Sequence, residues 1–289
     1  MHRWKLLLPL ALAAAIDGAA AQGAPSPDWT LGLTGGWSAP RDTGSDDTLL
    51  SLTVWLERQI GQAFVGGSIT IFEGDDAVPE TVSDVDRSSV SGSIWVAAPV
   101  GPAEVDLTVI YGRERFDGVF TSDGPFGSML DLEADTDIWS VAGGVSTVFR
   151  SGDVRFIPRA SLRYDSSQTD AGAIAGIGPI AQFDENQDGL TGSLGLRTSW
   201  AVRDRLSLSV NATGLAAENG AASAFAFSGR NGPGRPTVRQ DETAAQWAEL
   251  SGGVSIFPTE RSSLSISGGT TLGRDIDEVF VSVGISRSF

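Results

Sequence analysis

Apolar and polar residues alternate with a period of two from Trp29 to the end of the chain, in segments of about ten residues. Such alternation predicts β-strands with one apolar face and one polar face. Ten residues is roughly the length that a tilted strand needs to cross the hydrocarbon core of a bilayer. The segment 48–57 shows the pattern on its apolar face, with Leu50, Leu52, Val54 and Leu56.

Twelve such segments follow one another, and the connections between them alternate between short and long. Short connections lie at 59–62 and 99–102, whereas 114–136 and 166–189 are long. This alternation is typical of a barrel with tight turns at one membrane surface and larger loops at the other. The sequence therefore predicts an all-β fold, a closed antiparallel up-and-down transmembrane β-barrel of about twelve strands. The predicted strands are 29–38, 48–57, 63–72, 88–98, 103–113, 137–149, 154–165, 190–201, 205–215, 245–257, 262–272 and 279–289.

The N-terminus has the pattern of a secretory signal peptide. A short basic stretch ends at Lys5, an apolar run covers Leu6–Ala15, and the small residues Ala19–Ala21 offer a cleavage site. The apolar run is well short of the ~20 residues that a membrane-spanning helix needs. We therefore expect residues 1–21 to be a cleaved signal peptide and residues 22–289 to form the outer-membrane β-barrel domain.

Composition excludes several classes of function. The net charge of −16 argues against nucleic acid as a partner, because phosphate binding needs a basic surface. The chain has no cysteine, and its single lysine and single histidine, Lys5 and His2, both lie in the predicted signal peptide. Catalysis that depends on a histidine base, a lysine or a thiolate is thereby excluded. We expect neither enzymatic activity nor a cofactor.

The last segment ends Val281-Ser282-Val283-Gly284-Ile285-Ser286-Arg287-Ser288-Phe289. An alternating final strand with a C-terminal phenylalanine resembles the assembly signal of Gram-negative outer-membrane proteins. With the length and strand number, it makes residues 29–289 resemble the β-domain of autotransporters. The resemblance implies residence in the outer membrane, contact with lipid and lipopolysaccharide, and recognition of Phe289 by the barrel-assembly machinery. Arg287 departs from the aromatic residue usual there, and the short stretch 22–28 predicts a barrel without a passenger.

The polar faces carry a group of charges that we expect in the lumen. Three arginines recur at a spacing of four on one predicted strand, a fourth lies on the next strand, and acids lie on strands that we place across the barrel. Basic side chains opposite acids would make a narrow, charge-selective pore. Alternatively, the same charges pair and close the interior. The candidate pore-lining residues are Arg155, Arg159, Arg163, Arg197, Glu104, Asp106 and Glu57.

One acidic stretch matches the first half of a calcium-binding loop. Asp184, Asn186 and Asp188 are followed by a glycine, as in the D-x-N-x-D-G pattern, but Gly195 stands where such a loop needs a glutamate. A solvated acidic turn in an outer loop is the favoured interpretation, and a partial divalent-cation site is the alternative.

The predicted function is that of a porin-like passive channel for small solutes. A structural or surface-exposed barrel with a closed lumen and interacting loops is one alternative. An autotransporter-like translocator barrel that lacks its passenger is the other.

Overall fold

The computed structural model describes residues 29–40, 48–75, 82–121, 129–175, 178–218, 245–273 and 278–289. The predicted signal peptide, residues 1–21, lies outside them. All regular structure in these ranges is β-strand, and none of them holds a helix long and apolar enough to cross a membrane. The strands are β1 (Trp29–Pro40), β2 (Leu49–Ile60), β3 (Ala63–Asp75), β4 (Val82–Val100), β5 (Ala103–Thr121), β6 (Met129–Thr147), β7 (Phe149–Ser151), β8 (Val154–Ala175), β9 (Gly178–Arg203), β10 (Leu206–Glu218), β11 (Ala245–Thr259), β12 (Ser262–Leu272) and β13 (Glu278–Ser288).

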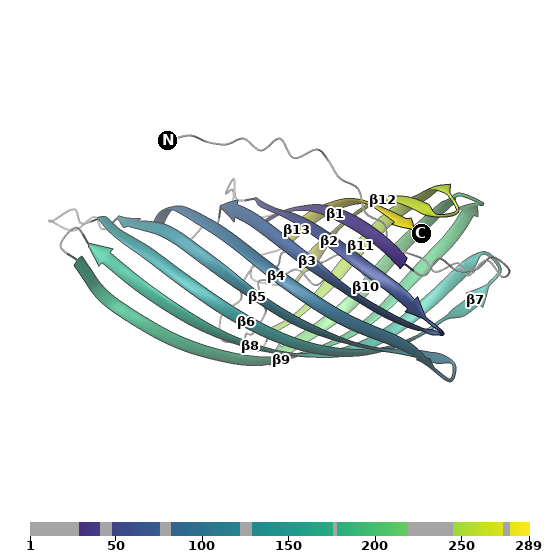
Figure 1. Cartoon of the computed structure of the whole chain (residues 1–289), viewed down its shortest axis with the longest axis horizontal. Helices are drawn as coiled ribbons and strands as arrows, with labels where there is room; N and C mark the ends of the chain where they lie inside the picture. The colour runs from purple at the N-terminus through teal and green to yellow at the C-terminus, as the bar shows by residue number, and fades with distance from the viewer. Residues whose placement is uncertain are drawn as a thin grey trace.

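Antiparallel pairing of neighbouring strands closes the sheet on itself (Figure 1). β1 pairs with β13 from Thr30 opposite Ser288 to Pro40 opposite Glu278, which joins the two ends of the chain's sheet. β7 continues β6 after one residue, Val148, and β8 pairs with both pieces. The thirteen pieces therefore form a closed antiparallel barrel of twelve strands, as the sequence predicts.

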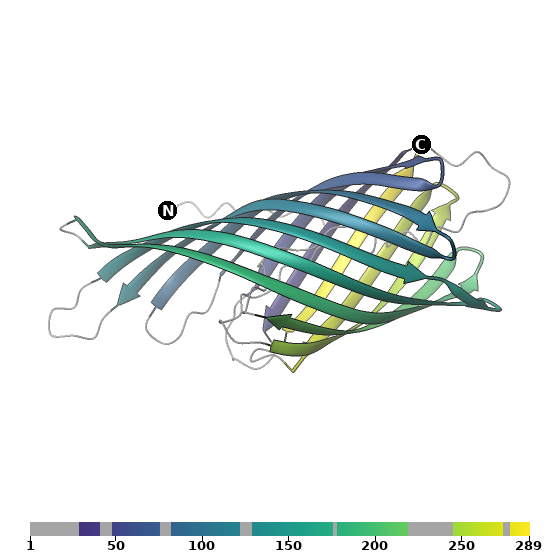
Figure 2. The same ribbon diagram turned by 90° about the horizontal axis from the view of Figure 1, so that it is seen from below.

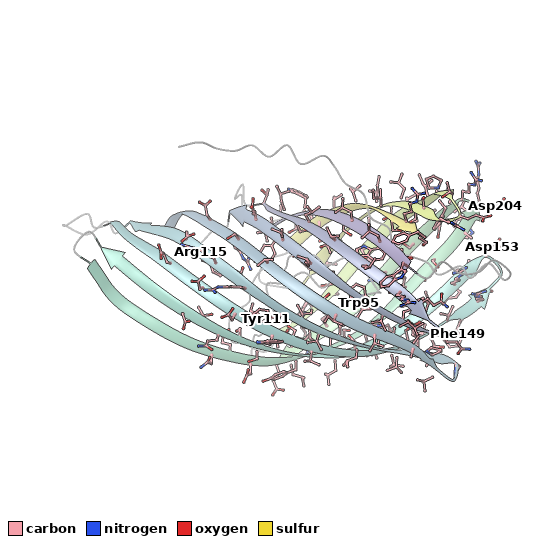
Figure 3. All side chains as sticks on the ribbon, in the orientation of Figure 1. Trp95, Tyr111, Arg115, Phe149, Asp153 and Asp204 are labelled. Atoms are coloured by element: carbon pink, nitrogen blue, oxygen red, sulfur yellow. The ribbon has the colours of Figure 1, made fainter. Side chains whose placement is uncertain are left out.

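The short connections are tight turns at one end of the barrel. Gly61, Gly101 and Gly152 each adopt positive φ, between 60° and 63°, in the turns after β2, β4 and β7. Glycine accepts this left-handed conformation without the clash that a Cβ atom would cause. Figure 3 shows Phe149, Asp153 and Asp204 gathered at this end and Arg115 toward the other. In membrane barrels the end with short turns is the periplasmic one.

The two faces of each strand differ as the alternation predicts. On β4, Ile94 points outward and is 69% exposed, whereas its neighbour Ser93 points inward and is 7% exposed. Exposed large apolar side chains cover the outer surface of the strands, which suits contact with lipid tails. In the sequence of β11, apolar residues fall on both faces, with Trp247 on one and Leu250 and Val254 on the other. The structure places Trp247 inward and Leu250 outward.

Aromatic side chains surround the outer surface in two belts. At the end with tight turns, exposed aromatic residues include Trp29, Phe149, Trp200 and Phe289. At the opposite level the exposed aromatic residues are Trp37, Tyr111, Trp139 and Tyr164. Aromatic rings of this kind mark the two interfaces of a membrane barrel.

Five strands continue well beyond the outer belt, and here the sequence-based boundaries are wrong. β4, β5 and β6 each have 19 residues, β8 has 22 and β9 has 26. Figures 1 and 2 show these strands protruding past the rest of the barrel as a curved sheet. Most of the predicted loops 114–136 and 166–189 is strand. Outside the bilayer no lipid enforces an apolar outer face, so the alternation that marks a strand in the sequence fades there.

Candidate functional site

Small hydroxyl side chains cover much of the inner wall of the barrel. They come from successive strands and meet in pairs across the sheet at oxygen–oxygen distances of 2.6–2.9 Å. At these positions the wall is polar and contributes little side-chain bulk. The pairs are Thr53–Thr70, Ser68–Ser93, Thr136–Thr169, Ser161–Ser193, Ser263–Ser286 and Ser267–Ser282.

Arg159 and Asp106 form a two-pronged ion pair inside the barrel. The two guanidinium nitrogens of Arg159 donate to the two carboxylate oxygens of Asp106 at 2.5 and 2.7 Å. The residues belong to β8 and β5, which flank β6 on either side. The side chain of Arg159 crosses β6 at Gly144, where an added Cβ would lie 2.7 Å from its Cζ. The acid therefore lies two strands away on the same wall, and its predicted place across the barrel is wrong.

Arg163 is also paired with an acid on its own wall. Its Nε donates to Asp165 at 2.7 Å, and the hydroxyl of Ser140 donates to the other oxygen of the same carboxylate. Both Asp165 and Ser140 are buried. The charge of this second arginine is thus compensated locally, as for Arg159.

Arg155 and Arg197 are half-buried on the same inner wall. In the pairing of β8 with β9, Arg197 stands opposite Ile157, midway between Arg155 and Arg159. The strand register therefore brings the four arginines to one region of the wall. Their influence on ions remains a prediction, as does that of Glu104, which is half-buried on β5.

Glu57 has a different role from the one expected in a row of acids facing arginines. It is buried on β2 and accepts a hydrogen bond from the indole nitrogen of Trp95, on β4, at 3.0 Å. The indole lies across β3 at Gly66, where a Cβ would meet its Nε1 at 2.6 Å. Here too a polar contact joins two strands over a glycine of the strand between them.

A buried ion pair near the outer end of the barrel is absent from the site residues that the sequence predicts. The Nε of Arg87, on β4, donates to Glu114, on β5, and both side chains are almost fully buried. The guanidinium also lies over the rings of Phe72 and Phe116, at 5.4 and 5.2 Å from their centroids. Arg87 and Glu114 both fall in connections that the sequence predicts between strands. The sequence therefore does not indicate whether their side chains point into the barrel. The only signal was the continued alternation of Arg87, Ser89 and Ser91 on the buried face.

The acidic turn that the sequence predicts at 184–188 is wrong, because the structure has a strand there. Asp184, Asn186 and Asp188 lie within β9, where alternate residues are about 6.6 Å apart along an extended strand. A calcium loop instead folds back so that its ligands converge on one ion. The side chains of Asn186 and Asp188 are exposed. Among the described residues, no group of three or more acidic, histidine or cysteine side chains could hold a metal ion.

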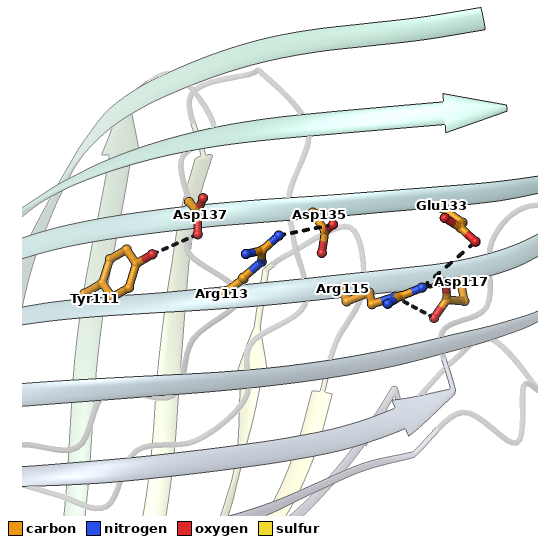
Figure 4. A network of polar contacts seen from close by, with 7 residues as sticks. All are labelled: Tyr111, Arg113, Arg115, Asp117, Glu133, Asp135 and Asp137. Atoms are coloured by element: carbon orange, nitrogen blue, oxygen red, sulfur yellow. Dashed lines mark hydrogen bonds and ion pairs between the residues drawn. The ribbon is translucent and has the colours of Figure 1, made fainter. Parts of the chain in front are cut away.

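Above the outer aromatic belt, the outward face of β5 and β6 carries a charged network (Figure 4). Tyr111 donates its hydroxyl to Asp137 at 3.0 Å, and Arg113 lies 3.3 Å from Asp135. The adjacent carboxylate of Asp135 raises the pKa of Arg113 above its ordinary value. We call this network the outer charged face, and its members are Tyr111, Arg113, Arg115, Asp117, Glu133, Asp135 and Asp137.

Comparison with known proteins shows which family the chain resembles. The family model for the autotransporter β-domain matches residues 16–269. No curated protein matches the chain.

Solved structures show the same fold at low sequence identity. The translocator domain of the autotransporter NalP from Neisseria meningitidis superposes with a TM-score of 0.70 and 11% identity, covering 93% of this chain and 90% of that one. The β-domain of the Bordetella autotransporter BrkA gives 0.63 and 17% identity, over 92% and 100% of the two chains. The toluene transporter TodX of Pseudomonas putida gives 0.52 and 10% identity, over 92% and 90%.

Proposed function

The chain belongs to the autotransporter β-domain family, and from that membership we propose that it acts as a translocator-type pore that passes an extended polypeptide through the barrel. Barrels of this family lie in the bacterial outer membrane. The observation that carries the proposal is the inner wall. It combines small hydroxyl side chains with ion pairs, Arg159–Asp106 and Arg163–Asp165, that are compensated within the wall.

A polypeptide in transit presents side chains of every kind in succession. A wall with a strong charge of one sign would hold segments of the opposite sign, because an unscreened pair of charges attracts strongly away from bulk water. Paired charges and hydroxyl groups offer only modest interactions, since each hydrogen bond that a chain makes with the wall replaces one with water. The inner wall therefore suits a chain that must keep moving.

A passive channel for small solutes is the second candidate. The observation that favours it is the presence of Arg155 and Arg197 on the inner wall beside the paired Arg159. A channel of this kind would prefer anions weakly, because Arg159 and Arg163 already have acidic partners. The row of four arginines in the sequence predicts a stronger preference.

A surface-display assay tests the translocator. An unstructured tagged segment is placed between the predicted signal peptide and Trp29, at the end of the barrel that carries the tight turns and Phe289. This segment reaches the cell surface only by passing through the barrel, so we expect protease added to intact cells to remove the tag. The folded state of the barrel is followed by its faster migration without boiling on a denaturing gel.

Two variants of one inner-wall residue give a matched comparison. Ser265 is buried on the inner face of β12. Ser265→Arg adds bulk and charge to the wall, so surface exposure of the tag should fall several-fold, whereas Ser265→Ala should leave it unchanged. A tag that stays in the periplasm on a correctly folded wild-type barrel overturns the proposal. If that barrel also conducts ions with a preference for anions in planar bilayers, the solute channel takes its place.

A further inference from the structure

The outward surface of β5 changes its chemistry at Tyr111. Before this residue the exposed side chains are apolar, Val105, Leu107 and Val109, and after it come Arg113 and Arg115. β6 changes in the same way at Trp139, whose ring packs on that of Tyr111 with centroids 4.6 Å apart. The change occurs at one level on both strands, so this level is the upper limit of the apolar band.

The height of the charged residues follows from strand geometry. Two residues advance about 6.6 Å along a strand, and a tilt of roughly 40° converts this to about 5 Å of height. Arg113 is then about 5 Å and Arg115 about 10 Å above the aromatic belt. The polar headgroup region of a bilayer adds about 5–8 Å on each side of the hydrocarbon core. Arg113, with Asp135 and Asp137 beside it, therefore lies at the level of the headgroups.

Stability alone does not account for this arrangement. The side chains of Arg113 and Asp135 are 58% and 45% exposed, and exposed ion pairs contribute about 0–1 kcal/mol. Each guanidinium has five N–H donors, and contacts with one or two carboxylates use only some of them. Arg115, one step further above the aromatic belt, contacts Asp117 at 3.1 Å and Glu133 at 4.0 Å (Figure 4).

The outer charged face combines two arginines with an excess of carboxylates. Guanidinium groups bind phosphate through paired hydrogen bonds. Divalent cations such as Mg²⁺ are commonly held by one or two carboxylates together with phosphate oxygens. A ligand that carries phosphates, shares divalent cations and has acyl chains to lie against Tyr111 and Trp139 matches every part of this surface. The carboxylates are Asp117, Glu133, Asp135 and Asp137.

We propose that the outer charged face binds the phosphorylated headgroup of lipopolysaccharide, with Arg113 and Arg115 on its phosphates and Asp135 and Asp137 on its divalent cations. The acyl chains of the same molecule lie along the apolar surface below Tyr111. This site is on the outside of the barrel and is independent of the passage of a polypeptide through the lumen.

The test measures binding of purified lipopolysaccharide to the refolded full chain in detergent, with Mg²⁺ present. Arg113→Gln/Arg115→Gln is expected to weaken binding at least tenfold, because it removes both phosphate-binding groups from an exposed surface without disturbing the fold. The matched control is Arg203→Gln/Arg205→Gln, two exposed arginines at the tight turn between β9 and β10. This control should bind as the wild type does.

Two further arms separate the components of the site. Asp135→Asn/Asp137→Asn should remove most of the difference in binding between Mg²⁺ and a chelator. Dephosphorylated lipopolysaccharide should bind the wild type no better than the arginine variant binds the intact lipid. The proposal fails if the two double-arginine variants weaken lipopolysaccharide binding equally, or if dephosphorylation leaves binding unchanged. It also fails if inorganic phosphate at equal concentration displaces the lipid. Migration of the unboiled protein confirms that each variant is folded.

Discussion

Adding one methyl group at Gly66 should destabilise the barrel strongly. Gly66 lies on β3 beneath the indole of Trp95, which is 3% exposed and bonded to Glu57. A Cβ at this position would meet the ring at its Nε1 at 2.6 Å, and also at Cε2 and Cζ2. Carbon atoms in packed proteins approach to only about 3.5–4.0 Å. The indole must therefore move, and it cannot move without weakening its hydrogen bond to Glu57.

The expected cost has two parts. Forcing an extra carbon into a packed site costs about 1–3 kcal/mol, and losing a hydrogen bond to a charged group costs about 1.5–3 kcal/mol. One movement of the ring causes part of each cost, so the two do not add in full, and we expect about 3 kcal/mol in total for Gly66→Ala. At roughly 2–4 °C per kcal/mol for a chain of this size, the melting temperature should fall by about 6–12 °C.

Urea titration of the protein refolded in lipid vesicles measures this cost, with the folded fraction read from migration without boiling. Gly92→Ala is the control, because Gly92 faces lipid on β4 and its nearest neighbour is a backbone oxygen at 3.7 Å. It should change stability by less than about 0.5 kcal/mol. In a Trp95→Leu background, Gly66→Ala should cost less than about 1 kcal/mol. Equal unfolding midpoints for the two glycine variants would refute the reasoning.

Three further predictions concern the lumen, the contact between the two ends of the sheet, and the N-terminus. Arg159→Ala should cost roughly 1–3 kcal/mol in the same titration, since it leaves the buried carboxylate of Asp106 without its two-pronged partner, and an unchanged midpoint would contradict this. Deleting Phe289 should lower the yield of membrane-inserted protein more than deleting a residue of any outer loop, because its backbone bonds Trp29 at 3.0 and 3.3 Å; membrane fractionation measures this. N-terminal sequencing of the extracted protein should begin at Gln22, and an intact first residue would disprove cleavage.

Within the bilayer, the sequence by itself determined the strands, the closed barrel that they form and, on every strand except β11, the face that points outward. Lipid on one side and a polar interior on the other require each strand to alternate, so residues such as Leu107 and Val109 identify their own face. The same alternation fixes the pairing register, because a shift by one residue would turn every side chain to the wrong face. The aromatic belts follow from the same cause.

Only the tertiary structure decided which residues meet inside the barrel and how far the strands extend above it. Asp106 and Arg159 are far apart in the sequence and belong to strands that do not touch. They meet because Gly144, on the strand between them, has no side chain in the way. Beyond the outer belt, β5 carries charged residues on its outward face as well as its inward face, so Glu114 and Arg115 show no alternation that separates a strand from a loop. Within the bilayer, contact with lipid requires the outward residues to be apolar. Above the bilayer, the residue types depend only on the contacts that each strand makes with its neighbours.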